Sequence, residues 1–342
     1  MSNNRGMKLW PGRSRVRTAI ILGMVAFVAA CGGPASGTPS PSPYAQAAGL
    51  PTGAASATAV PNASATASAT ASATARPNSG VPNFKHIYVI ILENKEYGRI
   101  VGSASAPYMN QLIARYGQAT NLYAETHPSE PNYIALTSGG LQGTNSDGTY
   151  DLSAPSLFDQ VETSGRTWHV YAQGYPGGCF KSFQAASVKD GIGAAGDYVR
   201  KHNPAMSYSA ISGNPTRCAN ITNLSGFDSA TADFEMIIPN EINDMHSGSV
   251  SAGDSFLKEF VPKITGNAAF ENSLLIVTFD EGDSNDQGGG HIATILAGPN
   301  MTPGSHFDGP ATHYSLLRTI ELAWNLPFLG KAATASTITL PY

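Results

Sequence analysis

The sequence predicts an α/β protein: a three-layer α/β/α sandwich built on a largely parallel central sheet. Several short runs are continuously apolar, which is typical of strands buried on both faces. Segments with helical spacing fall between or after these runs, as expected where helices cover both faces of a sheet. The chain of 342 residues is also long enough for one large domain.

The predicted elements follow in chain order. Residues 86–93 (HIYVIILE) form the clearest buried strand, because apolar and polar residues do not alternate in this run. Residues 107–117 then combine helical spacing with a terminal glycine, which predicts a helix. The other predicted strands lie within 120–125, 167–174, 235–239, 273–281 and 291–299, and the other main helices within 155–165, 253–266 and 314–324.

The N-terminus has the pattern of an export signal, residues 1–31. Basic residues lead into the apolar run 18–30, which is too short to span a bilayer and has the length of a signal-peptide core. The run ends at Cys31 after small residues, a pattern that resembles a bacterial lipobox. We therefore expect an exported protein, lipid-anchored to the membrane through Cys31 on the cell-surface or periplasmic side. The alternative is ordinary cleavage after Ala30 and secretion.

The next segment, residues 32–82, is composed mainly of Ala, Ser, Thr, Pro and Gly, with a near-repeat (NASATASATASATA). Such a composition cannot bury a core, so it predicts a disordered tether. The texture changes near Val81, and residues 83–342 are predicted to form one folded domain.

The charge of the body argues against nucleic acid as a partner. Five of the 20 basic residues precede residue 31, which leaves 15 against 24 acidic residues and a net charge of −9. Nucleic-acid binding requires a basic face.

Two cysteines remain in the exported body. Cys179 and Cys218 lie in an irregular stretch, Gly177–Ser229, that predicts an elaborated loop region. An even pair in an oxidising compartment predicts a disulfide. The alternatives are a pair of metal ligands or two free thiols.

Two predicted strands end in the same chemistry. One runs into Glu93-Asn94 and the other into Asp280-Glu281. Because ligands of open α/β sheets bind at the carboxyl ends of strands, both pairs are expected on one rim. Three carboxylates and an amide oxygen suit a divalent metal ion of unspecified identity, and without a cation the carboxylates would repel one another. The alternative is that these residues cap the helices that follow.

A serine lies at a similar point of the chain. Ser129, in THPSEPNYIALTSG, follows the run 120–125 and precedes a helix-forming run. The unpaired N–H groups at the start of that helix favour an anion, and a metal nearby would activate the hydroxyl as a nucleophile. The alternative is that Ser129 is an N-cap, which the spacing alone supports equally well. The loop histidines His202, His246 and His291 are candidates to donate to a phosphate or to protonate a leaving group.

These motifs together resemble the bacterial and fungal phosphoesterases that include acid phosphatases and phospholipases C, within the alkaline phosphatase superfamily. The resemblance covers nearly the whole body and includes FKHIYVIILENKEYGRIVG, THPSEPNYIALTSG, RKHNPA, NEINDMHSG, IVTFDEGDSND and GGGHIATILAGP, in that order. It implies an alkaline-phosphatase-like sandwich and phosphoryl transfer through a phosphoserine intermediate.

The resemblance also implies roles for particular residues. Ser129 of HPS matches the family's nucleophile, and His202 and His246 match histidines that surround the phosphate. The EN and DE pairs match metal ligands, here Glu93, Asn94, Asp280 and Glu281. Asp244 and His291 match recurrent positions of the family to which we assign no role.

One residue departs from the family pattern. Glu130 stands where relatives often have an apolar residue, and it places a carboxylate beside Ser129 that would disfavour dianionic substrates or contact a leaving group. The body is short for a phospholipase C, which favours hydrolysis of small phosphate monoesters as in acid phosphatases. The alternatives are a phospholipase C-like phosphodiesterase, transfer to an acceptor alcohol, and a non-catalytic surface binding lipoprotein.

Overall fold

Strand β1 (His86–Leu92) lies in the middle of the main sheet, and all of its residues are buried. The structure is a computed structural model that describes residues 80–186 and 192–339. In this part of the chain the main sheet has eight strands in the order β10-β2-β9-β8-β1-β7-β3-β6. The remaining strands of the sheet are β2 (Gly117–Ala119), β3 (Trp168–Ala172), β6 (Ile221–Asn223), β7 (Phe234–Ile238), β8 (Ser273–Phe279), β9 (Thr294–Ala297) and β10 (Ser305–Phe307).

The sheet is largely parallel, as predicted. Strand β1 pairs in parallel with β7 on one side and with β8 on the other. Strand β3 continues the parallel arrangement by pairing with both β7 and β6. Strand β9 is the exception, because it runs antiparallel to both β8 and β2.

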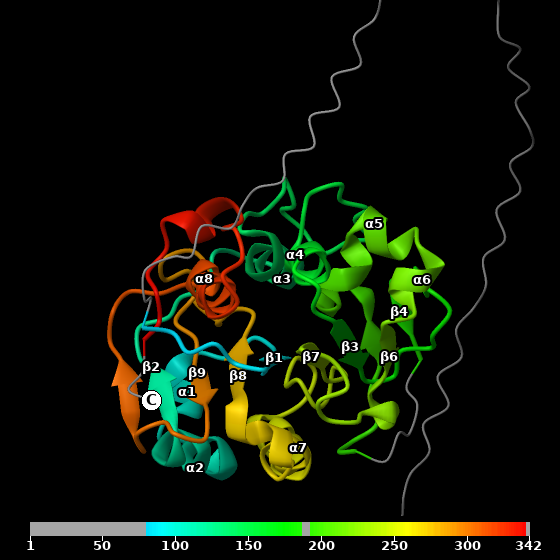
Figure 1. Cartoon of the computed structure of the whole chain (residues 1–342). Helices are drawn as coiled ribbons and strands as arrows, with labels where there is room; N and C mark the ends of the chain where they lie inside the picture. Colours follow the sequence, from blue (N-terminus) through cyan, green and yellow to red (C-terminus); the bar gives the residue numbers. More distant parts are fainter. Residues whose placement is uncertain (1–79, 187–191, 340–342) are drawn as a thin grey trace, which may run out of the picture. The chain divides into compact units, whose positions relative to one another are not determined.

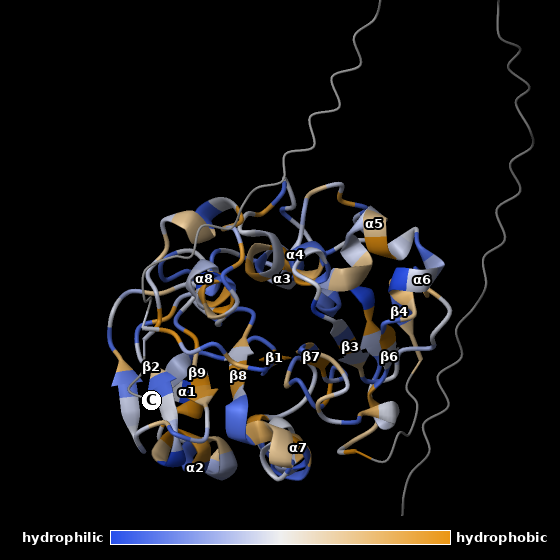
Figure 2. Ribbon diagram, viewed as in Figure 1, coloured by the Kyte–Doolittle hydropathy of each residue, from blue (hydrophilic) through white to orange (hydrophobic). Residues whose placement is uncertain are grey.

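Helices cover both faces of the sheet, which confirms the predicted three-layer sandwich. Figure 1 shows α3 (Ser129–Ser138), α4 (Leu157–Thr163) and α8 (His313–Ala323) on one face. On the other face lie α2 (Pro107–Arg115) and α7 (Val250–Thr265), which contact each other. Figure 2 shows both apolar and polar residues on α7, as expected for a helix with one buried side.

Most predicted elements are confirmed, with small shifts of their ends. Helix α7 begins at Val250, before the predicted start at residue 253, because the Ser249 side chain caps it by accepting a hydrogen bond from Ala252 N. The short helices α1 (Tyr97–Ile100), α5 (Ser209–Ser212) and α6 (Pro215–Cys218) add turns at the surface.

The predicted strand at 120–125 is wrong. In this stretch Leu122 and Tyr123 form only isolated bridges, to Ala311 and His291. Further along, the backbone N–H of Ala124 donates to Gly290 O, in a loop rather than in a strand. An apolar run can therefore be buried without becoming a strand when its neighbours on the sheet edge are loops.

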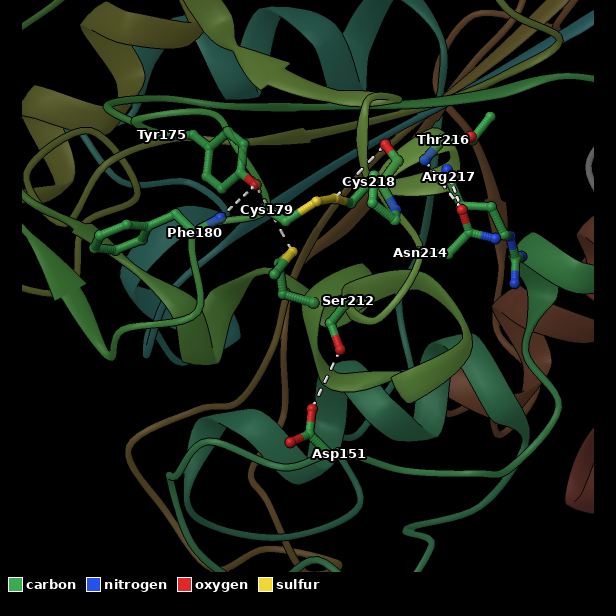
Figure 3. Close-up of a disulfide and its surroundings, with 11 residues drawn as sticks. Asp151, Tyr175, Cys179, Phe180, Ser212, Asn214, Thr216, Arg217 and Cys218 are labelled. Carbon is green, nitrogen blue, oxygen red and sulfur yellow. Dashed lines mark hydrogen bonds between the residues drawn. A yellow bond between two sulfur atoms is a disulfide. The ribbon is translucent and has the colours of Figure 1, made fainter.

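The irregular region is confirmed as an elaborated loop with short elements, among them the two-residue strands β4 (Gln184–Ala185) and β5 (Tyr198–Val199) and the 3-10 turn η1 (Arg200–His202). Figure 3 shows the disulfide between Cys179 and Cys218. The Cα atoms of the two residues are 5.5 Å apart. The alternatives of a metal pair and free thiols are thereby excluded. The disulfide ties the start of this loop to the end of α6.

The predicted signal peptide 1–31, with Cys31, lies outside the described residues. So do all but the last three residues of the predicted tether 32–82. Of the helices in the described ranges, none has the length and apolar character needed to cross a membrane. The predicted domain boundaries and the lipid anchor therefore stay predictions.

Candidate active site

The two acidic pairs meet at the carboxyl edge of the sheet. Leu92 at the end of β1 pairs in register with Phe279 at the end of β8, so the residues that follow leave the sheet side by side. The backbone N–H of Asn94 donates to Asp280 Oδ1 over 3.1 Å. Its side-chain amide donates to Glu281 Oε1 over 2.9 Å. The expectation that both pairs share one rim is confirmed.

Ser129 faces the same edge. It is the first residue of α3 and is 1% exposed, and its Oγ donates to Glu93 Oε2 over 3.0 Å. The N-cap position of α3 is occupied by Pro128, and among the described residues no side chain at this position makes a capping hydrogen bond to the helix. The Ser129 hydroxyl therefore points at the acidic cluster and does not cap the helix.

Tyr133 completes the hydrogen bonding of Glu93. It lies four residues after Ser129, on the same side of α3. Its hydroxyl donates to Glu93 Oε1, so α3 supplies a donor to each oxygen of this carboxylate. Sequence reasoning missed Tyr133, although its helical spacing from Ser129 was a usable signal.

His202 lies between two of the carboxylates. Its Nε2 is 3.2 Å from Glu93 Oε1 and its Nδ1 is 3.2 Å from Asp244 Oδ2. The side chain is 1% exposed and stacks on Tyr133. Burial, with the neighbouring charge of Lys201, holds the pKa of His202 well below its usual value. Both ring nitrogens are therefore close to acidic oxygens while the ring itself disfavours a proton.

His246 forms the outer part of the cluster. Its ring centroid is 5.7 Å from that of His202, and its side chain is 32% exposed. Glu93, His202 and His246 each offer a ligand atom, and these atoms lie within 4.8 Å of one another. The predicted catalytic residues Ser129, His202 and His246 are thus gathered at one place, with His246 nearest to solvent.

The acidic cluster is electrostatically unfavourable on its own. Burial, followed by repulsion from Asp280 and Asp244, raises the pKa of Glu93 well above its usual value. Burial likewise raises the pKa values of Asp244 and Asp280. Burial, followed by repulsion from the charge of Asp280, also raises the pKa of Glu281. Such a group of carboxylates gains most from a cation.

The unpaired atoms of the cluster fit a divalent cation. In the described part of the chain, three buried side-chain oxygens without a hydrogen-bond partner belong to this cluster: Asn94 Oδ1, Asp244 Oδ2 and Asp280 Oδ2. Both ring nitrogens of His202 are in the same state. Buried acceptors without a donor are costly, and oxygen-rich sets of this kind are typical of hard divalent cations.

Glu281 is held differently from the other predicted metal ligands. Its Oε1 accepts from the Asn94 amide, and its Oε2 lies 2.9 Å from Nδ1 of His127. In this arrangement Glu281 holds the amide nitrogen of Asn94, so that the unpaired Asn94 Oδ1 remains available to a cation. Asp244 was predicted without a role, and its unpaired Oδ2 places it among the candidate ligands.

Two other residues singled out from the sequence have partners of their own. His291 stacks between Tyr97 and Tyr123 and hydrogen-bonds to Thr120 O. The Glu130 carboxylate is fully buried and accepts hydrogen bonds from Ser207 Oγ and Gly148 N, each over 2.7 Å. Burial raises the pKa of Glu130 to about 7.

Glu130 is thus engaged inside the protein, although it follows Ser129 in sequence. The expectation that it contacts a leaving group is not supported.

A lysine and an aspartate at the site were missed by the sequence analysis. Lys201 Nζ donates to Asp147 Oδ2 over 2.9 Å, and Asp147 Oδ1 accepts from Glu130 N over 3.0 Å. Lys201 had a signal, because it precedes His202 in RKHNPA. Asp147 had none, because its surroundings (NSDGT) are typical of an ordinary turn.

The model of the phosphoesterase family matches residues 103–327, well over half of the chain. The chain belongs to the phosphoesterase family. Membership of this family confirms the predicted resemblance and makes the protein a phosphoric ester hydrolase.

Two curated proteins support this membership, and one solved structure shows the same fold. A phosphatidylinositol-3-phosphatase of Mycobacterium tuberculosis is 32% identical over 268 residues, covering 76% of this chain and 84% of that protein. A probable acid phosphatase of Kluyveromyces lactis is 31% identical over 259 residues, covering 72% of this chain and 60% of that protein. The lipoteichoic acid synthase LtaP of Listeria monocytogenes aligns with a TM-score of 0.52 at 9% identity, covering 77% of this chain and 79% of that one, which shows a shared fold alone.

Proposed function

We propose that this phosphoesterase is an exported, divalent-metal-dependent hydrolase of phosphate monoesters in which Ser129 is the nucleophile. The observation that carries the proposal is the Ser129 hydroxyl, which starts α3 and lies 3.0 Å from Glu93 within a buried acidic cluster. A nucleophile beside a metal site at a helix N-terminus suits phosphoryl transfer, because that end of a helix favours an anion.

Of the four predicted ligands, Glu93, Asn94 and Asp280 would hold the metal, and Glu281 fits best as the residue that orients Asn94. His202 lies close enough to Glu93, and Asp244 close enough to His202, to contribute. Bound there, a divalent cation would lower the pKa of the Ser129 hydroxyl and offset the negative charge of the phosphate.

The reaction that we propose has two displacements. Ser129 gives up its hydroxyl proton and its Oγ attacks the substrate phosphorus in line. The bond from phosphorus to the leaving oxygen breaks as that oxygen takes up a proton, and a phosphoserine forms. Water then attacks the same phosphorus, orthophosphate leaves, and the serine hydroxyl is restored. Glu93 Oε2 accepts the hydrogen bond of the hydroxyl and so orients its lone pairs. Positioning and charge neutralisation would supply most of the rate.

The histidines take separate parts in this scheme. His246 is partly exposed and would protonate the leaving oxygen where the product alcohol departs. His202 is buried against Glu93 and Asp244, where it would fix the geometry of the carboxylates around the phosphate.

The proposed substrates are phosphate monoesters, because the named relatives are described as phosphatases. The mycobacterial relative is described as acting on a phosphoinositide, which makes a lipid phosphate a second substrate to test beside small soluble esters. Hydrolysis of p-nitrophenyl phosphate, bis(p-nitrophenyl) phosphate and phosphatidylinositol 3-phosphate by the purified full-length protein would compare these classes.

We expect the monoesters to be hydrolysed and the diester to be a poor substrate. Preference for the diester would support the phospholipase C-like alternative. Metal-dependent phosphate binding with no turnover of any ester would support the binding lipoprotein.

The cellular location that we propose rests on the N-terminal pattern alone. The predicted signal, the lipidated Cys31 and the tether would place the enzyme at the cell surface or on the periplasmic side of the membrane. Labelling of the wild-type protein by a palmitate analogue, and its absence in Cys31→Ala, would establish the anchor. An unlabelled but secreted protein would support cleavage after Ala30 instead.

A further inference from the structure

A lysine and an aspartate form an ion pair at the start of α3. Lys201 Nζ donates to Asp147 Oδ2 over 2.9 Å, and the side chains of Lys201 and Asp147 are 9% and 24% exposed. The same ammonium lies 3.4 Å from Nε2 of His246, at the outer part of the cluster. Through Asp147, a cation is therefore held next to the residue that follows the nucleophile, beside side chains that are partly exposed.

The aspartate carboxylate bridges two donors. While its Oδ2 accepts from Lys201, its Oδ1 accepts from Glu130 N over 3.0 Å. Glu130 N belongs to the residue directly after Ser129, a position whose N–H commonly stabilises charge developing on the group attacked by a serine. A carboxylate at this place satisfies the donors that a phosphate bound to Ser129 would need.

Other contacts keep these donors in position. The Glu130 carboxylate accepts from Gly148 N, next to Asp147, and from Ser207 Oγ, close in sequence to Lys201. His202 follows Lys201, is 1% exposed, and has its ring nitrogens 3.2 Å from carboxylate oxygens of Glu93 and Asp244. The site thus combines a cation and a helix N–H, next to a buried imidazole that faces the acidic cluster.

We propose that Lys201 Nζ and the Glu130 backbone N–H form the phosphate subsite of this enzyme, and that the Asp147 carboxylate fills it until the substrate phosphate displaces it. The inference rests on the proposed function, because it takes Ser129 as the atom to which the phosphate binds. The Asp147 carboxylate and a phosphate would compete for the Lys201 ammonium and the Glu130 N–H. The two anions would also repel each other if both were bound there. Asp147 therefore lowers the affinity for phosphate, whereas Lys201 raises it.

A different account of Lys201 makes opposite predictions. If the lysine only offsets the charge of the acidic cluster, its removal would strengthen binding of a metal ion and leave phosphate binding unchanged. The lysine is electrostatically coupled to Glu93, Asp244 and Glu281, so this account requires a direct test.

The test measures binding of inorganic phosphate without turnover. The full-length Ser129→Ala protein, loaded with Mn²⁺, is titrated with orthophosphate by calorimetry, alone and with Lys201→Met, Lys201→Arg or Asp147→Asn added. Binding of Mn²⁺ is measured in the same set. Lys95→Met is the matched control, because Lys95 Nζ is bound to the carbonyls of Asn94 and Met245 and belongs to the same rim.

We expect Lys201→Met to weaken phosphate binding by about tenfold or more, the usual effect of losing a charge-assisted hydrogen bond. Lys201→Arg should retain most of the affinity, Asp147→Asn should bind phosphate more tightly than its parent, and Lys95→Met should change binding less than Lys201→Met. Unchanged phosphate affinity in Lys201→Met, or weaker binding in Asp147→Asn, would overturn the proposal.

The result is separable from the proposed function. The inhibition constant of orthophosphate against hydrolysis of p-nitrophenyl phosphate, measured with Lys201→Arg and Asp147→Asn on the intact Ser129 enzyme, gives the same comparison. If Ser129→Ala keeps full turnover, the nucleophile assignment fails, and this comparison still decides whether Lys201 and Asp147 form the subsite. If Ser129→Ala is inactive and these variants leave the inhibition constant unchanged, the subsite alone is wrong.

Discussion

A buried acid away from the active site predicts how stability depends on pH. Glu235 in β7 is fully buried, its Oε1 accepts from Ala232 N over 3.0 Å, and within the described ranges its Oε2 has no hydrogen-bond partner. Burial raises the pKa of Glu235 from an ordinary value of 4.5 to about 7. The substitution Glu235→Gln removes this titration while leaving an oxygen to accept from Ala232.

The sign follows from the direction of the shift. The folded state binds the Glu235 proton more tightly than the unfolded chain does, so the associated stability is fully present below about pH 4.5 and is lost as the pH rises through about 7. At about 1.4 kcal/mol per pKa unit, a shift of this size is worth about 3 kcal/mol. Between pH 5 and pH 8 the wild type should lose about 2–3 kcal/mol from this group, whereas Glu235→Gln should not.

The assay is urea unfolding of both proteins at pH 5 and at pH 8. Relative to the wild type, the free energy of unfolding of Glu235→Gln should rise by about 2–3 kcal/mol from the lower to the higher pH. Glu271→Gln, which removes an exposed carboxylate, is the matched control and should follow the wild type. A difference between Glu235→Gln and the wild type that stays constant across the two pH values would refute the reasoning.

The active site supports further predictions. Tyr133→Phe leaves Glu93 Oε1 without its donor, so steady-state kinetics should show kcat falling by about tenfold or more, and an unchanged kcat in a folded variant would remove Tyr133 from the site. Removal of the metal by a chelator should abolish turnover and lower the melting temperature, because the carboxylates of the acidic cluster then repel one another. Addition of Mn²⁺ should restore both. Full activity of the chelated protein would exclude a role of the metal in turnover. His246→Asn should slow hydrolysis of an alkyl phosphate by about 100-fold or more but of p-nitrophenyl phosphate far less, because only the alkoxide leaving group needs a proton; equal losses would deny His246 that role.

The sequence predicted the parts of the site that belong to single elements. Glu93 and Asp280 could be placed together because each ends a long apolar strand, and strands β1 and β8 prove to be parallel neighbours in register. Ser129 could be placed at a helix start because the residues after it favour a helix and the turn before it contains proline.

The residues that sequence reasoning missed act through long-range contacts. Asp147 meets Lys201 across 54 residues, and its neighbours in sequence are typical of any turn. The error at 120–125 has a similar cause, because apolar character indicates burial but not whether the neighbouring segment is a strand or a loop. The burial of the Glu130 carboxylate was also beyond prediction, since its partners Ser207 and Gly148 come from separate segments of the chain.

The central claim is that Ser129 carries the phosphoryl group during turnover. The most direct measurement is the intact and peptide mass of the metal-loaded enzyme after rapid acid quench during hydrolysis of p-nitrophenyl phosphate, compared with Ser129→Ala. We expect the wild type to gain one phosphoryl group on the peptide that contains Ser129, and Ser129→Ala to gain none and to lose nearly all turnover with its fold intact. A phosphoryl group on another residue, or full turnover by a folded Ser129→Ala protein, would contradict the account.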